Sequence, residues 1–186
     1  MSSTVSALGG VSHEGFATVA EAGLRGMITV RGDLSSAAMK KAVKAATGTT
    51  VPEVRQIVTK EGKAAAWMSP DELLILVPYE AAQDTVAVLE KALAGSHHLV
   101  ADVSDARAVF TVAGAKADQV LMKLCPVDMA TLADGEIRRT RTAQVAAAFW
   151  KSGAEEYTLV SFRSVATYVM GLLQASSRPG SELFPA

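Results

Sequence analysis

The sequence has few of the residues from which extracellular scaffolds and metal sites are commonly built. A single cysteine, Cys125, excludes an internal disulfide framework and indicates a reducing compartment. No Cys or carboxylate stands at zinc-ligand spacing around the adjacent pair His97–His98. No apolar run approaches the roughly 20 residues that span a bilayer, and residues 1–16 lack the basic start and apolar core of a signal peptide. We therefore expect a cytoplasmic protein with no membrane partner.

An excess of positive charge is also missing. The 186 residues include 18 Lys and Arg against 19 Asp and Glu, for a net charge of −1, with no large basic block. Nucleic acid is therefore not an expected partner. Hydrophobic residues make up 49% of the chain, and a chain of this length buries about 70% of its unfolded surface. One domain, or two small ones sharing a core, is expected.

Catalytic patterns are missing as well. Cys125 precedes Pro126 at a predicted helix end, where the negative end of the helix dipole disfavours a thiolate, so a buried or interface thiol is expected. The segment Asp102–Arg107 carries two carboxylates, but Asp and Ser at such a junction usually bond to turn backbone. Gly32 and Gly114 belong to no phosphate-binding motif. We predict no catalytic, cofactor-binding or metal-binding residue in this chain.

What the sequence does contain is an internal repeat. "WMSPDELLILV" (Trp67–Val77) and "WKSGAEEYTLV" (Trp150–Val160) share Trp-x-Ser and a final Leu-Val, 83 residues apart, and Met27–Asp33 aligns with Val109–Ala115 at an offset of 82. The elements between them recur in order, which indicates a duplication. We predict an α+β fold of two ferredoxin-like β-α-β-β-α halves about a pseudo-twofold axis, with the two Trp residues in equivalent places.

The repeat sets the expected boundaries. Residues 1–22 are predicted to be an N-terminal extension, and 176–186 a C-terminal tail. Residues 23–175 form a single domain of two repeats, about 23–96 and 97–175. Leu73–Val77 shows no alternation of apolar and polar residues, so we expect this strand to be covered on both faces. We also expect the closing helix to place three residues in one helical register. Those residues are Val165, Tyr168 and Leu172.

Apolar residues in the terminal segments and one arginine cluster are the candidate partner contacts. Leu8, Phe16, Leu183 and Phe184 can dock on a larger protein, with terminal disorder as the alternative. We expect the tails to be mobile alone and ordered in a complex. The cluster "RRTR" can grip an acidic partner or form a solvated strand edge. Its arginines are Arg138, Arg139 and Arg141.

Several motifs, in order, resemble those of one known family. The second half contains "ADVSDARAVFTVAG", a helix ending in "CPVDM", the strand "AQVAAAFW" and "YTLVSFRSVATYVMGLL"; the first half contains "RGDL" and "WMSPDELLILVP". Together they resemble the gamma subunit family of heterotetrameric sarcosine oxidase, over about residues 23–175. Each motif is weak alone, and their order makes the resemblance specific.

The resemblance implies a non-catalytic, stabilising subunit of an oxidoreductase complex that converts sarcosine to glycine and passes the one-carbon unit to tetrahydrofolate. It implies alpha, beta and delta subunits as partners, which hold FAD, FMN, NAD, tetrahydrofolate and zinc. It also implies a fold related to the folate-binding domain of the glycine-cleavage T-protein. Two alternatives remain: a subunit of a related N-methyl amino-acid dehydrogenase, or a free-standing folate-binding enzyme of the T-protein type.

Overall fold

Each of two units in the chain is an antiparallel sheet with two helices on one face. The computed structural model describes residues 4–184. Unit 2 spans Arg25–Asp105, and unit 1 joins the N-terminal segment up to Leu24 to the chain from Ala106 onward. The helices carry an inward apolar stripe, and the strands present alternate side chains to them, so each unit has its own hydrophobic core.

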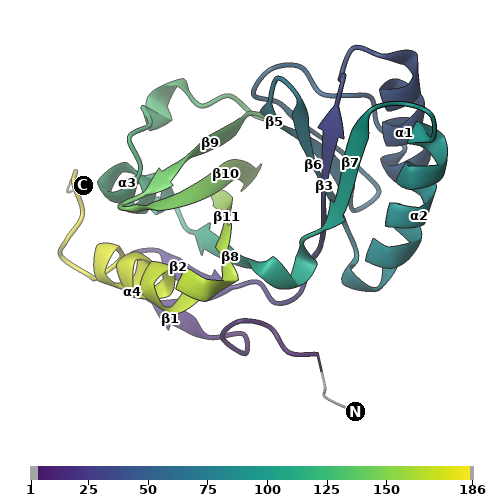
Figure 1. Cartoon of the computed structure of the whole chain (residues 1–186). Coiled ribbons are helices and arrows are strands. Elements are labelled where there is room, and N and C mark those ends of the chain that lie inside the picture. Colours follow the sequence, from purple (N-terminus) through teal and green to yellow (C-terminus); the bar gives the residue numbers. More distant parts are fainter. Residues whose placement is uncertain (1–3, 185–186) are drawn as a thin grey trace. The chain divides into compact units, whose positions relative to one another are not determined.

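Unit 2 contains a five-stranded sheet in the order β4-β5-β6-β3-β7. Its strands are β3 (Gly26–Gly32), β4 (Ile57–Lys60), β5 (Lys63–Ser69), β6 (Glu72–Val77) and β7 (His98–Asp102). The helices α1 (Ala37–Thr47) and α2 (Ala82–Leu93) lie side by side on one face (Figure 1). Ser36 caps α1 by accepting from the Met39 amide, and Gly48 ends it in the left-handed conformation. Residues 73–77 are at most 4% exposed, so the prediction that this run is covered on both faces is confirmed.

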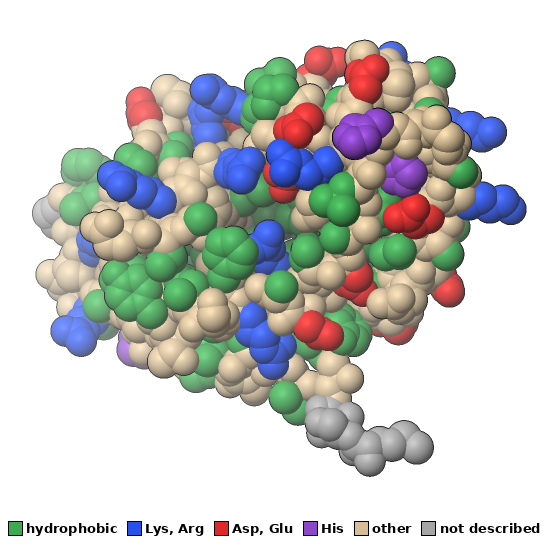
Figure 2. Space-filling view, in the orientation of Figure 1, with side chains coloured by type: hydrophobic (Ala, Val, Ile, Leu, Met, Phe, Trp, Pro, Cys, Tyr) green, Lys and Arg blue, Asp and Glu red, His purple; other side chains and the backbone are tan. Residues whose placement is uncertain are grey.

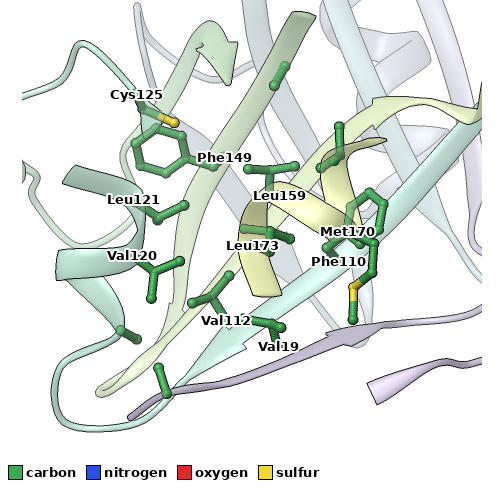
Figure 3. Packing of buried hydrophobic residues seen from close by; sticks show 14 of the residues in the cluster. Val19, Phe110, Val112, Val120, Leu121, Cys125, Phe149, Leu159, Met170 and Leu173 are labelled. Atoms are coloured by element: carbon green, nitrogen blue, oxygen red, sulfur yellow. The ribbon is translucent and has the colours of Figure 1, made fainter. Parts of the chain in front are cut away.

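Unit 1 contains a six-stranded sheet in the order β1-β2-β8-β11-β10-β9. Its strands are β1 (Ser12–Glu14), β2 (Thr18–Glu21), β8 (Arg107–Ala113), β9 (Ile137–Thr142), β10 (Val145–Gly153) and β11 (Glu156–Phe162). The helices are α3 (Ala117–Leu124) and α4 (Ala166–Ser176). Figure 3 shows Leu173 and Met170 of α4 directed at the sheet residues Leu159 and Phe110, all at most 3% exposed.

The order of elements confirms the duplication. The series β3-α1-β4-β5-β6-α2 recurs as β8-α3-β9-β10-β11-α4, as predicted for an α+β fold of two halves. The strand before each series pairs outside it: β2 precedes β3 but pairs with β8, and β7 precedes β8 but pairs with β3. The expected division at residues 96 and 97 therefore differs from the structural one at Asp105 and Ala106, because β7 belongs to the first sheet.

The N-terminal segment also differs from the expected extension. Strand β2 pairs with β8 over four residues and places Val19, which is fully buried, in the core of unit 1. Its other inward residue is Glu21, 5% exposed. A strand of four residues with one apolar and one acidic inward side chain does not show the alternation by which a core strand is recognised.

The two repeated Trp residues do not hold equivalent places, contrary to expectation. Trp67 lies opposite Leu73, on the face that packs against the helices of unit 2. Trp150 lies opposite Thr158, one residue out of step with the core pair Phe149–Leu159, and therefore on the other face of its sheet. The bulge follows Trp67 in the first hairpin but Lys151, one residue beyond Trp150, in the second. A one-residue difference in register reverses the face that a side chain occupies.

Candidate partner-binding surface

The apolar residues of the N-terminal segment contact the protein's own core. Leu8 and Phe16 are partly buried against the core of unit 1. The segment is held by Glu21, whose carboxylate accepts hydrogen bonds from Ser6 Oγ at 2.9 Å, Leu8 N at 3.1 Å and Gly10 N at 2.6 Å. Leu8 and Phe16 thus have an intramolecular role, which their position in the sequence did not indicate.

The C-terminal segment leaves its apolar side chains at the surface while its backbone is held. Gln119 Oε1 accepts hydrogen bonds from Leu183 N at 2.7 Å and Phe184 N at 3.2 Å. The two side chains are 45% and 62% exposed. Lys123 Nζ donates to Ser176 O, Ser181 O and Ser181 Oγ. The side chains of Leu183 and Phe184 are therefore exposed to solvent while hydrogen bonds fix the backbone that carries them.

The arginines of the "RRTR" cluster lie on β9, at the edge of the unit 1 sheet. Side chains alternate along a strand, so Arg138 faces one side and Arg139 and Arg141 the other. Arg138 is 16% exposed and pairs with Glu136 at 2.8 Å. Arg139 and Arg141 are exposed. The structure therefore does not bring the three guanidinium groups into one site.

A group of exposed aromatic side chains was missed by sequence reasoning. Phe162 is 45% and Tyr168 46% exposed, and Figure 2 shows hydrophobic side chains gathered over α4. The guanidinium carbon of Arg107 lies 4.2 Å from the centroid of the Phe162 ring. The core residues of α4 are Ala166, Val169, Met170 and Leu173, so Tyr168 lies off the buried face of the helix. A helix that is apolar all round gives no periodic signal for its inner face.

Unit 2 carries an open hollow of about 580 Å³, whose ionisable lining residues are Arg31, Asp33, Asp71, His97 and His98. Arg31 pairs with Asp71 at 2.9 Å. His98 lies 3.0 Å from a Glu90 carboxylate oxygen and 2.8 Å from the Ser96 carbonyl oxygen. These two acceptors, Glu90 first, raise the pKa of His98 by favouring the doubly protonated ring. The arrangement closes the turn between α2 and β7.

Residues 4–184 contain neither a cluster of potential metal ligands nor a helix that could span a membrane. In this part of the chain, no three His, Cys, Asp or Glu side chains are grouped so that they could hold a metal ion. Within the same residues, no helix combines the length and apolar character needed to cross a membrane.

The thiol of Cys125 is expected to resist modification in the folded protein. Its side chain is 5% exposed, and Figure 3 shows it beside the ring of Phe149. Burial raises the pKa of this thiol and outweighs the contact of Sγ with Thr142 Oγ1 at 3.6 Å. We predict that a disulfide reagent at pH 8 reacts with native protein slower by on the order of 100-fold or more than with protein in guanidinium, because the reaction requires local opening. Equal rates in the two states would contradict the burial.

The chain resembles known proteins in sequence and in structure. The model of the "Sarcosine oxidase, gamma subunit family" matches residues 31–179. Sarcosine oxidase subunit gamma of Corynebacterium sp. (strain P-1) is 32% identical over 162 residues, which cover 84% of this chain and 77% of that protein.

Two solved structures share the fold. Heterotetrameric sarcosine oxidase from Corynebacterium sp. U-96 matches with a TM-score of 0.79 and 24% identity, over 87% of this chain and 83% of that one. Glycine cleavage system aminomethyltransferase T from Bartonella henselae matches with a TM-score of 0.63 and 16% identity, over 83% of this chain and 44% of that one. At these identities the structural matches establish the fold alone. The family match covers most of the sequence, and the chain therefore belongs to the sarcosine oxidase gamma subunit family.

Proposed function

We propose that this chain is a non-catalytic, stabilising subunit of a heterotetrameric sarcosine oxidase. The observation that carries the proposal is the family match over residues 31–179, together with the similarity to a protein named as a sarcosine oxidase gamma subunit. The only thiol supports this role, since Cys125 is buried with a raised pKa and is unsuited to nucleophilic chemistry.

The cofactors belong, in this proposal, to the partner chains. FAD, FMN, NAD, tetrahydrofolate and zinc are assigned to the alpha, beta and delta subunits, and this chain contributes contact surface in the cytoplasm. Leu183 and Phe184 are proposed contacts because they are exposed on a tethered backbone. Arg139 and Arg141 are proposed contacts because both are exposed and lie on the same face of an edge strand.

The test is reconstitution of the complex with and without this chain. We expect native mass spectrometry of the co-expressed alpha, beta, gamma and delta subunits to give a stoichiometric four-chain complex that oxidises sarcosine. Leaving this chain out should lower the activity or thermal stability of the remainder. A three-chain assembly with unchanged activity and stability would overturn the proposal.

The same preparation separates the two alternatives. A complex that prefers another N-methyl amino acid to sarcosine would identify a related dehydrogenase with the same subunit role. The likeness to aminomethyltransferase T favours testing the isolated chain with tetrahydrofolate by calorimetry. Folate binding by the isolated chain, with no association to the other subunits, would instead identify a free-standing folate-binding protein.

A further inference from the structure

The outer face of α4 carries no charge. Residues 164–177 contain no Asp, Glu, Lys or Arg, although the helix turns one face to solvent. Tyr168 and Gly171 are exposed and Leu172 is partly exposed. Of the four α-helices within residues 4–184, α4 alone lacks a charged side chain. We refer to Phe162, Tyr168, Gly171, Leu172 and Ala175 as the α4 surface.

The corresponding helix of the other repeat shows that the fold does not require this composition. Helix α2 follows β6 as α4 follows β11, and it likewise buries one face in its own core. Its exposed residues include Asp84, Glu90 and Lys91. Since both helices serve the same purpose inside their units, the uncharged outer face of α4 needs another explanation.

Two further features extend the α4 surface. Phe162 lies opposite Arg107 in the β8–β11 pair, and the guanidinium stacks on its ring. Arg163 Nη2 donates to Val5 O at 2.8 Å, which places the backbone of Val5, a residue 59% exposed, beside the start of α4. Aromatic residues and arginine are enriched in the centres of protein interfaces, where lysine and acidic residues are depleted.

Along the chain, the charged residues that flank α4 have one sign. Residues 157–181 contain no carboxylate side chain, and their only charged residues are Arg163 and Arg178, one at each end of the helix. Together with Arg107 on Phe162, they place cations around an apolar centre. A complementary partner surface has apolar side chains opposite Tyr168 and Leu172, and Asp or Glu at its rim.

We propose that the α4 surface is where this chain docks on another subunit of its complex, against an apolar patch rimmed by carboxylates. The inference rests on the proposed function and adds the location and chemistry of the contact. At Gly171, an added Cβ would meet nothing within 4 Å in this chain. The partner can therefore approach the helix backbone closely at that point.

The main test changes Tyr168→Asp in the co-expressed complex, with Val88→Asp on α2 as the matched control. Val88 is also an exposed apolar residue on an outer helix face, 39% exposed. We expect Tyr168→Asp to weaken association by about 30-fold or more, as for an interface hot spot. Val88→Asp should leave association unchanged. Thermal unfolding of both isolated variants checks that neither has lost its fold.

A second variant, Gly171→Ala, has opposite effects on the chain and on the complex. It should raise the stability of the isolated chain, because Ala is the better helix former, and it should weaken association because the added methyl meets the partner. A third, Arg178→Glu, should slow association several-fold at low salt if the partner rim is acidic.

The outcomes separate this inference from the proposed function. Failure of the wild-type chain to assemble with the other subunits would overturn the proposed function. Normal assembly of both Tyr168→Asp and Gly171→Ala would overturn the α4 surface alone. An unchanged association rate for Arg178→Glu would overturn the acidic rim. A homodimer of the isolated chain that Tyr168→Asp dissociates, with normal assembly of the complex, would identify a second copy as the occupant and overturn the proposed partner.

Discussion

Replacing Phe110 by Ala is expected to lower the free energy of unfolding by about 3–5 kcal/mol, the range for a fully buried aromatic residue. Phe110 is 0% exposed and lies on β8 between β2 and β11, opposite Glu21 and Leu159. Strands on both sides and helices α3 and α4 above limit how far the site can collapse around the cavity. Because domains are stable by about 5–15 kcal/mol, the loss is a large share of the total.

The same substitution at Phe162 is the matched control. Phe162 is 45% exposed, and its ring contacts Arg107, so Phe162→Ala should cost no more than about 1 kcal/mol. Urea unfolding of the full chain, followed by hydrogen exchange at amides of each unit, measures both changes. The Phe110 loss should appear first in amides of unit 1. Equal losses for the two variants would show that Phe110 is not the core residue described here.

The duplication could be predicted because short sequence motifs recur in both halves. The pairing of β2 and β7 with strands outside their own repeats could not be predicted. The Trp-x-Ser phrases at Trp67 and Trp150 mark the same hairpin in each half, with a bulge in both. That β2 pairs with β8 and β7 with β3 depends on contacts distant in sequence, about which periodicity says nothing. The face occupied by each Trp depended on a single residue of register, which the turn sets rather than the repeated phrase.

The sequence indicated that apolar residues of the terminal segments make contacts, but not which surface they contact. Apolar residues in a polar terminal segment indicate a docking role, but composition does not say whether the receiving surface is the protein's own. Phe16 packs on the core of unit 1, whereas Phe184 is 62% exposed. Tyr168 shows the opposite outcome, since its side chain is exposed although it lies in an apolar helix. Its exposure follows from the placement of Val169 and Leu173 against the sheet.

Replacing Glu21 by Gln is expected to release the N-terminal segment while the rest of unit 1 stays folded. The carboxylate accepts hydrogen bonds from Ser6 Oγ, Leu8 N and Gly10 N, and an amide has only one acceptor oxygen and sets its NH2 group against these donors. Hydrogen bonds to a charged group contribute about 1.5–3 kcal/mol each. Loss of one such hydrogen bond is enough to speed hydrogen exchange at the Leu8 and Gly10 amides by about 10- to 100-fold.

The control for that experiment is Glu14→Gln. Glu14 lies on the edge strand β1 and accepts one hydrogen bond, from Thr18 Oγ1, at an exposed position. We expect hydrogen exchange at Leu8 and Gly10 in this variant to match wild type. If the two variants exchanged alike, the segment would be held by its apolar contacts rather than by the buried carboxylate.

The same carboxylate should make the N-terminal segment open in acid. Burial raises the pKa of Glu21, but hydrogen bonds from Gly10, Ser6 and Leu8 outweigh burial and lower the folded-state pKa below the ordinary 4.5. The stabilisation is therefore fully present above pH 4.5 and is lost as the pH falls through that lowered pKa. Corrected for intrinsic rates, wild-type exchange at Leu8 and Gly10 should approach that of Glu21→Gln as the pH falls, while the Gln variant stays constant. A difference that persists with the carboxyl protonated would mean that its shape, and not its charge, holds the segment.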